Sequence, residues 1–225
     1  LLIASNQLQR LSVAGAPVLS SLDATSNSLT TFPAGLVPGP WPPPPHRPDL
    51  TDPTDGAPSV ESTAPLGQAE PPLASALTTL RLAQNAIRTL PPGLPGACGK
   101  LMEMDISFNQ ISALPPDLDR LTNLRKLSAC GNRLTELPPA LWRLPSLLEL
   151  MAGRNAIAAL PPAPVPPAPR GGCEDDASNS AAHGARLGLV ELCLPSNRLV
   201  ALDAALLAAM PSLTRLDVTA NTLSA

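Results

Sequence analysis

The 225-residue chain contains no tyrosine and only four other aromatic residues, two phenylalanines and two tryptophans. Branched aliphatic side chains must therefore supply its core. Only two of its fifteen basic residues are lysines, and its formal net charge is −3. Such a chain has no broad positive field to hold a phosphate backbone, so nucleic acid is not expected as a partner.

The sequence also lacks a run of 18 apolar residues and begins without the basic segment of a secretory signal. We therefore predict no membrane insertion. Its cysteines lie far apart and form no C-x-x-C pair, which favours a reducing, intracellular (cytoplasmic) compartment. These residues are Cys98, Cys130, Cys173 and Cys193. Because the chain lacks an initiator methionine and begins and ends within a repeat, we expect it to be truncated at both ends.

The sequence does contain a repeated pattern of leucines, L-x-x-L-x-L-x-x-N-x-L. The clearest copies are Leu77–Ile87, Leu101–Ile111 and Leu213–Leu223, and Leu189–Leu199 also keeps every apolar position. Three copies have alanine in one leucine position, and the first copy is incomplete. The alanines are Ala24, Ala129 and Ala152. This pattern is the leucine-rich repeat.

One asparagine in each copy gives the period of the repeat. These residues are Asn6, Asn27, Asn85, Asn109, Asn132, Asn155, Asn197 and Asn221. Five of the seven spacings lie within two residues of 23, and the other two, 58 and 42, exceed 23 by 35 and 19 residues. Both long spacings contain proline-rich segments. About eight repeats are therefore predicted in a single domain over residues 1–225.

Strand geometry explains the fold that this period predicts. In x-x-L-x-L-x-x the two leucines point to one face of a strand and the x residues to the other. Neighbouring repeats must stack to bury the leucine face, which gives a solenoid with a concave parallel sheet. The asparagine amide can bind backbone groups where the chain leaves each strand. We expect an α/β horseshoe with a structural ladder of asparagines.

The return path of each repeat carries Leu-Pro-x-x-Leu, as at Leu90–Leu94. Proline fixes φ and removes a backbone donor, which predicts an irregular or short-helical convex side. The segment Leu202–Met210 has no proline and contains strong helix formers, so a short helix is expected there. Trp142, also on the return path, is expected to pack on the convex side rather than contact a ligand.

The two insertions occupy residues 37–72 and 162–186, which are rich in proline, glycine and small or acidic residues. We predict that both are disordered, because they offer few large apolar side chains to offset the entropy of ordering. Residues 41–47 contain P-x-x-P-x-R, a pattern that SH3-like modules bind as a polyproline II helix. A low-complexity insertion is the alternative interpretation of that segment.

The repeat and its Leu-Pro-x-x-Leu return resemble the typical-class intracellular leucine-rich-repeat proteins, which include the Ras-group and Shoc2-like scaffolds. The resemblance covers every repeat and neither insertion. It implies an intracellular adaptor without enzymatic activity. It implies no particular partner, because the binding residues of this family lie at the variable x positions.

The x positions of the strands predict the binding face. Together they place a mildly acidic patch on the concave surface, which we interpret as a binding site for a protein partner; a merely solvated face is the alternative. The candidate residues are Arg81, Glu103, Asp105, Phe108, Lys126, Glu149, Met151, Glu191, Arg215 and Asp217. Phe108 and Met151 are the large apolar members, and an aromatic residue there could be a binding hot spot. For Phe108, packing along the strand edge is the alternative.

Nothing in the sequence predicts catalysis, a cofactor or a metal site. Its two histidines, His46 and His183, lie in the insertions, and no phosphate-binding loop or nucleophile-elbow motif occurs. Cys173 and the following acidic run lack the spacing of structural metal ligands. We interpret the chain as a non-catalytic scaffold in intracellular signalling or complex assembly. The alternative is a recognition module of a larger kinase, cyclase or ubiquitin ligase with its catalytic domain elsewhere.

Overall fold

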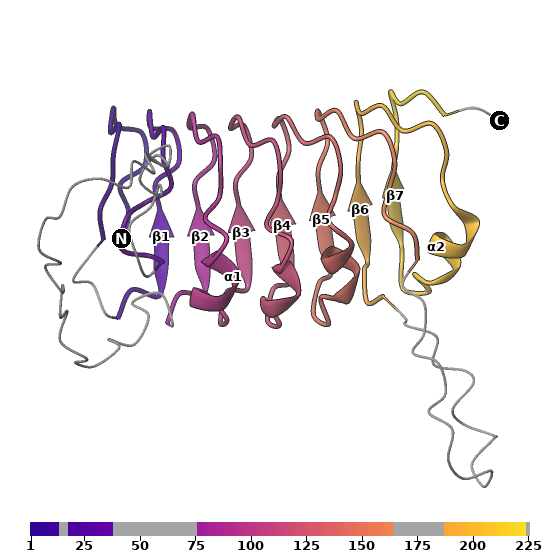
Figure 1. Ribbon diagram of the computed structural model, residues 1–225, viewed down its shortest axis with the longest axis horizontal. Coiled ribbons are helices and arrows are strands. Elements are labelled where there is room, and N and C mark those ends of the chain that lie inside the picture. Colours follow the sequence, from indigo (N-terminus) through magenta and orange to yellow (C-terminus); the bar gives the residue numbers. More distant parts are fainter. Residues whose placement is uncertain (14–17, 38–75, 164–186, 224–225) are drawn as a thin grey trace, which may run out of the picture.

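The fold is a solenoid built on a seven-stranded parallel sheet, in which each strand pairs with the next along the chain (Figure 1). This computed structural model describes residues 1–13, 18–37, 76–163 and 187–223. Its strands are β1 (Ser21–Asp23), β2 (Thr79–Arg81), β3 (Glu103–Asp105), β4 (Lys126–Ser128), β5 (Glu149–Met151), β6 (Glu191–Cys193) and β7 (Arg215–Asp217). The predicted fold class, a leucine-rich repeat horseshoe, is confirmed.

The incomplete first copy also joins the sheet, through a single parallel bridge between Leu2 and Asp23. The predicted insertions at residues 37–72 and 162–186 lie outside the described residues, apart from their first one or two positions. The P-x-x-P-x-R segment lies outside them as well. Strands β1 and β2 pair in register although 55 residues separate Asp23 from Thr79. The sheet therefore continues directly across the first insertion.

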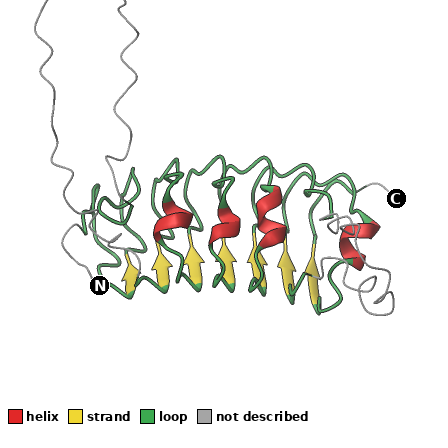
Figure 2. Cartoon of the chain, turned by 60° about the horizontal axis from the view of Figure 1, so that its bottom comes forward, coloured by secondary structure: helices red, strands yellow, loops and turns green. Residues whose placement is uncertain are grey.

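The return paths are short helices and turns that cover the opposite side of the solenoid from the strands (Figure 2). They include α1 (Leu94–Ala97), α2 (Ala204–Ala208) and two 3-10 helices, Leu118–Arg120 and Pro139–Arg143. Asp203 caps α2 by accepting a hydrogen bond from the Ala205 N–H at 2.8 Å. The expected helix within Leu202–Met210 is thus present. Trp142 is buried here and donates from Nε1 to the Pro161 carbonyl at 3.0 Å, which confirms its convex packing.

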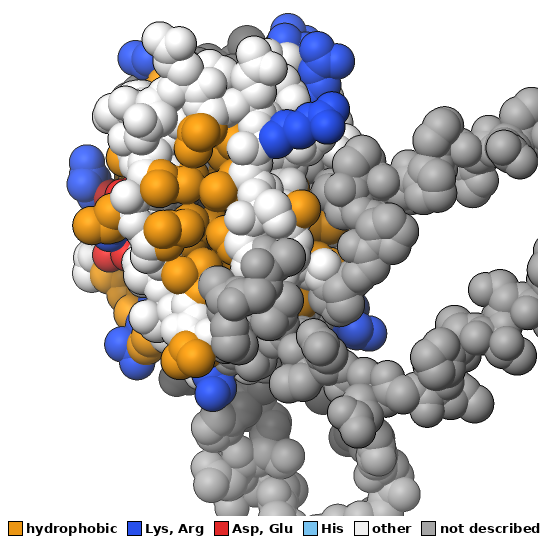
Figure 3. All heavy atoms as spheres, turned by 90° about the vertical axis from the view of Figure 1, so that its left-hand side faces the viewer, with side chains coloured by type: hydrophobic (Ala, Val, Ile, Leu, Met, Phe, Trp, Pro, Cys, Tyr) orange, Lys and Arg blue, Asp and Glu red, His pale blue; other side chains and the backbone are white. Residues whose placement is uncertain are grey.

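The core lies between the sheet and the return paths and consists of stacked aliphatic layers. The middle residue of each strand from β1 to β6 is fully buried: Leu22, Leu80, Met104, Leu127, Leu150 and Leu192. Each methylene group buried in these layers stabilises the folded state by about 0.8 kcal/mol. At the N-terminal end the layers are open, and hydrophobic side chains gather in the middle of that end (Figure 3). Leu2 and Val18 are about 80% exposed (80% and 81%).

The asparagines connect consecutive coils of the solenoid. Asn109 accepts a hydrogen bond at Oδ1 from the Ile87 N–H in the preceding coil, at 3.0 Å. Its Nδ2 donates to the Leu82 carbonyl of that coil at 2.9 Å and to two carbonyls of its own turn. The same pattern recurs at Asn27, Asn85, Asn132, Asn155, Asn197 and Asn221. One amide therefore satisfies backbone groups on two coils that would otherwise be buried without partners.

A second feature repeats at the residue before each asparagine, where the backbone is left-handed. Its φ lies between 54° and 64° in every coil. The residues are Ser5, Ser26, Gln84, Phe108, Gly131, Arg154, Ser196 and Ala220. Only one of these is glycine, so the other seven side chains occupy a conformation that costs roughly 1–2 kcal/mol per residue. The asparagine hydrogen bonds and the stacked turns offset that cost.

Gly131 is the position where this turn cannot accept a side chain without a rearrangement. Its φ is +64°, and a Cβ added there would lie 2.6 Å from Cδ1 of Phe108. The Phe108 ring, on the preceding coil, therefore lies against the Gly131 backbone. The ring is still 47% exposed. One side of the ring therefore packs along the strand edge, and the role of its exposed side in binding stays a prediction.

We predict that Asn109→Ala lowers the free energy of unfolding by about 1–3 kcal/mol, because the buried Ile87 N–H and the carbonyls lose their partner. Denaturant unfolding followed by circular dichroism measures this change. Asn6→Ala is the matched control, since the Asn6 amide is exposed and binds only carbonyls of its own turn in the described structure. Equal losses in the two variants would contradict the role of the inter-coil bonds.

We also predict that Gly131→Ala destabilises the fold by about 1–3 kcal/mol, from the left-handed backbone and the contact with Phe108. Adding Phe108→Ala should recover the contact part of the loss and leave the backbone part. Thermal melting of the two single variants and the double variant separates these parts. Gly99→Ala is the control, since a Cβ there would have no atom within 4 Å beyond Gly99 and its two chain neighbours. A fully additive double variant would show that the ring contact contributes nothing.

Candidate functional site

The solvent-facing side chains of the strands form two columns across the sheet. The first column is the first residue of each strand: Ser21, Thr79, Glu103, Lys126, Glu149, Glu191 and Arg215. The second column is the third residue of each strand: Asp23, Arg81, Asp105, Ser128, Met151, Cys193 and Asp217. The register pairs each member with the next along its column. The structure thus brings together the nine sequence-predicted strand residues on one surface, which we call the open sheet face.

Three ion pairs cross between neighbouring strands on this face. Arg81 holds Glu103 through Nε and Nη2, with a shortest distance of 3.1 Å. Lys126 pairs with Glu149 at 2.8 Å, and this hydrogen bond raises the pKa of the lysine. Arg215 pairs with Glu191 at 2.9 Å. All three glutamates that the sequence assigned to an acidic patch are therefore neutralised by a base on the adjacent strand.

The remaining acidic charge lies in the second column, at Asp23, Asp105 and Asp217. Each of these carboxylates accepts a hydrogen bond from the backbone N–H two residues later, at 3.0 to 3.1 Å. At Asp217 the Thr219 backbone and hydroxyl both donate, which lowers the pKa of the carboxyl. The turns that follow β1, β3 and β7 thus fix the direction of these aspartates. Aspartate followed two residues later by threonine or serine is the sequence signal of this arrangement.

The centre of the second column carries no charge. Ser128 donates weakly from Oγ to Met151 Sδ at 3.9 Å, and Cys193 donates from Sγ to Glu191 Oε1 at 3.3 Å. Desolvation and the neighbouring carboxylate raise the pKa of Cys193 to about 11. The thiol is therefore protonated at neutral pH, and the centre of the face is a polarizable, weakly polar surface rather than a nucleophilic site.

Sequence reasoning missed three exposed apolar residues beside this surface. Met102, Leu148 and Val190 come directly before β3, β5 and β6 and are 38%, 41% and 36% exposed. All three occupy the first x of the repeat template, so an apolar residue at that x is the sequence signal for them. This position lies just outside the two columns. At the opposite ends of the strands, Phe108 adds an exposed ring beside the turn after β3. Apolar groups therefore lie at both ends of the strands, with the ion pairs between them.

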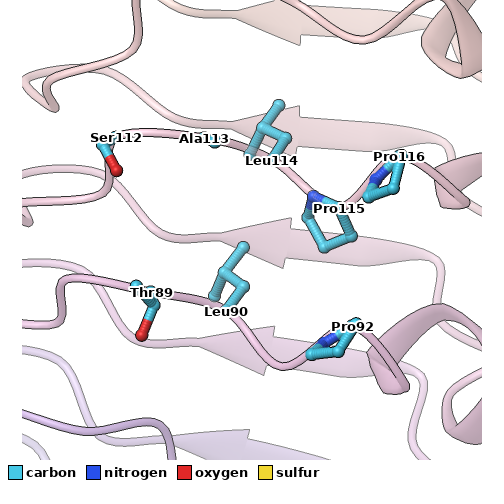
Figure 4. A pocket seen from close by; sticks show the side chains of 8 residues that line it. All are labelled: Thr89, Leu90, Pro92, Ser112, Ala113, Leu114, Pro115 and Pro116. Carbon is cyan, nitrogen blue, oxygen red and sulfur yellow. The ribbon is translucent and has the colours of Figure 1, made fainter.

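The return paths contain shallow hollows between the Leu-Pro segments of consecutive coils. One has a volume of about 180 Å³ and is drawn in Figure 4, lined by Thr89, Leu90, Pro92, Ser112, Ala113, Leu114, Pro115 and Pro116. A second, of about 390 Å³, repeats this arrangement between Thr135 and Pro162 and contains one titratable side chain, Glu136. Binding sites for small molecules need several convergent polar groups, which neither hollow has.

In the part of the chain that the structure describes, no three histidine, cysteine, aspartate or glutamate side chains come together in a way that could hold a metal ion. None of the helices there is long and apolar enough to cross a membrane. His46, His183 and Cys173 lie outside the described residues.

Comparisons with known proteins agree with the repeat. Residues 75–134 match the family model described as "Leucine rich repeat". A comparison with curated proteins found no match. Among solved structures, the ectodomain of the Arabidopsis thaliana receptor kinase GASSHO1/SCHENGEN3, in complex with CASPARIAN STRIP INTEGRITY FACTOR 2, has a TM-score of 0.60 and 20% identity, and the match covers 96% of this chain and 21% of that one.

Two bacterial proteins have the same fold. The Leptospira interrogans protein LIC12759 matches with a TM-score of 0.52 and 20% identity over 92% of this chain and 44% of its own. The internalin InlF of Listeria monocytogenes matches with a TM-score of 0.51 and 22% identity over 69% and 39%. The chain thus spans less than half the length of each of these solved chains. The chain has the leucine-rich repeat fold, and its residues 75–134 carry the sequence pattern of the leucine-rich repeat family.

Proposed function

We propose that the chain is a non-catalytic protein-interaction scaffold that binds a protein partner through the open sheet face. The observation that supports this most is the register of the sheet, which aligns charged and apolar side chains from seven strands on one surface. Leucine-rich repeat domains typically mediate protein–protein interaction, and solenoids use their extended concave surfaces for it. The proposed function requires no cofactor.

The charges on the face favour a partner with a basic or mixed surface. The glutamates already pair with bases of this chain. The aspartates of the second column, above all Asp105 and Asp217, are therefore the groups that would attract a basic group of the partner. Met151 and the partly exposed Phe108 lie within or beside the same surface and supply apolar contact area. Charged groups of this kind raise specificity and association rate more than affinity. Apolar anchors supply more of the binding energy.

We further propose an intracellular location and a role in signalling or complex assembly. Cys98, Cys130 and Cys193 are free thiols, as a reducing compartment favours. Burial raises the pKa of the Cys98 thiol to about 12, so it is an inert core residue. The sequence resembles leucine-rich-repeat-containing protein 40 at residues 2–9, 77–160 and 199–223. Its repeat with the Leu-Pro-x-x-Leu return also resembles the Shoc2-like scaffolds, and both resemblances support the same assignment.

Replacing Asp105 and Asp217 by asparagine tests the binding face. Asparagine keeps the oxygen that accepts from the turn N–H and removes the charge, so the fold should be retained. We expect the partner that the wild-type chain captures from a cell extract to bind D105N/D217N with a lower association rate, roughly three- to tenfold at low salt. Surface plasmon resonance with that purified partner measures the rate.

The matched control is D119N/D203N, which changes the charge equally on the convex side. The asparagine introduced in place of Asp203 would still cap α2, because its side-chain oxygen can accept the same hydrogen bond. The variant should bind at the wild-type rate. Equal slowing by both double variants would indicate only a general charge effect, and no slowing by D105N/D217N would contradict the proposed face. Phe108→Ala in a third variant should instead raise the dissociation rate, because it removes an apolar anchor.

A further inference from the structure

Three arginines form an exposed group at the edge of the solenoid where the strands end, away from the two columns of the sheet face. We call Arg133, Arg154 and Arg198 the arginine rim. Backbone hydrogen bonds fix its geometry: Arg133, Ala156 and Arg198 each donate from N–H to the same position of the preceding coil, at 2.8 to 2.9 Å. Residues 133, 156 and 198 are therefore equivalent positions on three successive coils.

The middle coil carries alanine at this position, so Arg133 and Arg198 flank a small side chain. Their backbones are two coils apart, roughly 10 Å at the usual spacing of neighbouring strands. Arg154 precedes Ala156 by two residues and occupies the left-handed turn position, with φ of 56°. Its equivalents on the two adjacent coils, Gly131 and Ser196, are small. Three long basic side chains thus start from neighbouring positions of three successive coils, and the Phe108 ring lies beside them against Gly131.

Like several other bases of the described residues, the rim arginines form no ion pair there. Within the described residues the ion pairs use Arg81, Arg120, Lys126, Arg143 and Arg215 as their bases. All three rim residues are exposed. The chain has a net charge of −3, yet these three positive side chains form no ion pair within the described residues.

We propose that the arginine rim binds an acidic protein segment, an extended stretch with aspartate or glutamate at alternate positions. Guanidinium groups bind carboxylates with two parallel hydrogen bonds, which makes arginine well suited to this ligand. In an extended chain, alternate side chains lie about 7 Å apart on one face. Several separate carboxylates match the spread of the three arginines over three coils better than one compact phosphate does. This site is distinct from the open sheet face and does not depend on the function proposed for that face.

A seven-residue fluorescent peptide with glutamate at every second position and serine between tests the rim directly. Fluorescence anisotropy measures its affinity for the whole chain. We expect R133Q/R198Q to weaken binding at least tenfold. R154K, which keeps the charge but cannot form the paired hydrogen bonds, should weaken it by a smaller factor. The affinity of the wild-type chain should fall as salt rises, because exposed charges are screened.

The matched control is R120Q/R143Q, which removes the same charge from the convex side and should stay within twofold of the wild type. Circular dichroism melting checks that each variant is folded, which is expected because the rim side chains are exposed. Two results would overturn the proposal: equal affinity of R133Q/R198Q and wild type, or equal weakening in rim and control variants. So would tighter binding of a phosphoserine peptide or a seven-nucleotide thymidine strand through the same arginines, since the ligand class would then be wrong.

Discussion

Seven asparagine side chains hold consecutive coils of this protein at a fixed offset, each through one accepted and one donated hydrogen bond to the coil before it. The hydrophobic effect alone would not set that offset, because it is non-directional. The aliphatic layer of one coil can slide against the next and keep most of its buried area. The amide removes this freedom, since a shift of one residue would leave buried N–H and carbonyl groups unpaired. The register of the whole sheet follows from it.

That register determines the functional surfaces. Because every strand begins at an equivalent position, the first residues of neighbouring strands come within ion-pair distance, as Lys126 and Glu149 do. The turn that the asparagine closes also places residue 133 level with residues 156 and 198, which forms the arginine rim. One repeated constraint thus produces two surfaces of opposite character: a face whose unpaired charges are aspartates, and an edge whose unpaired charges are arginines.

The sequence predicted the parallel sheet and the nine strand residues that share its open face, because the alternation of leucines determines which side chains face solvent. It also predicted the short helix near Asp203 from the local propensities. It did not predict that Arg81 would neutralise Glu103, because pairing across strands depends on rotamers of long side chains rather than on spacing. The left-handed turn residues were missed for a different reason: Phe108 and Arg154 are residue types that do not signal this conformation, and tertiary hydrogen bonds impose it.

Amide hydrogen exchange tests most directly whether the asparagine ladder fixes the coils. The N–H groups of Ile87, Ile111, Leu134, Ile157 and Leu199 donate only to an asparagine side chain of the next coil, outside any strand or helix. We predict that these amides exchange as slowly as those within β3 to β6, because opening them requires the separation of two coils. Exchange as fast as in the exposed parts of the return paths would contradict the account.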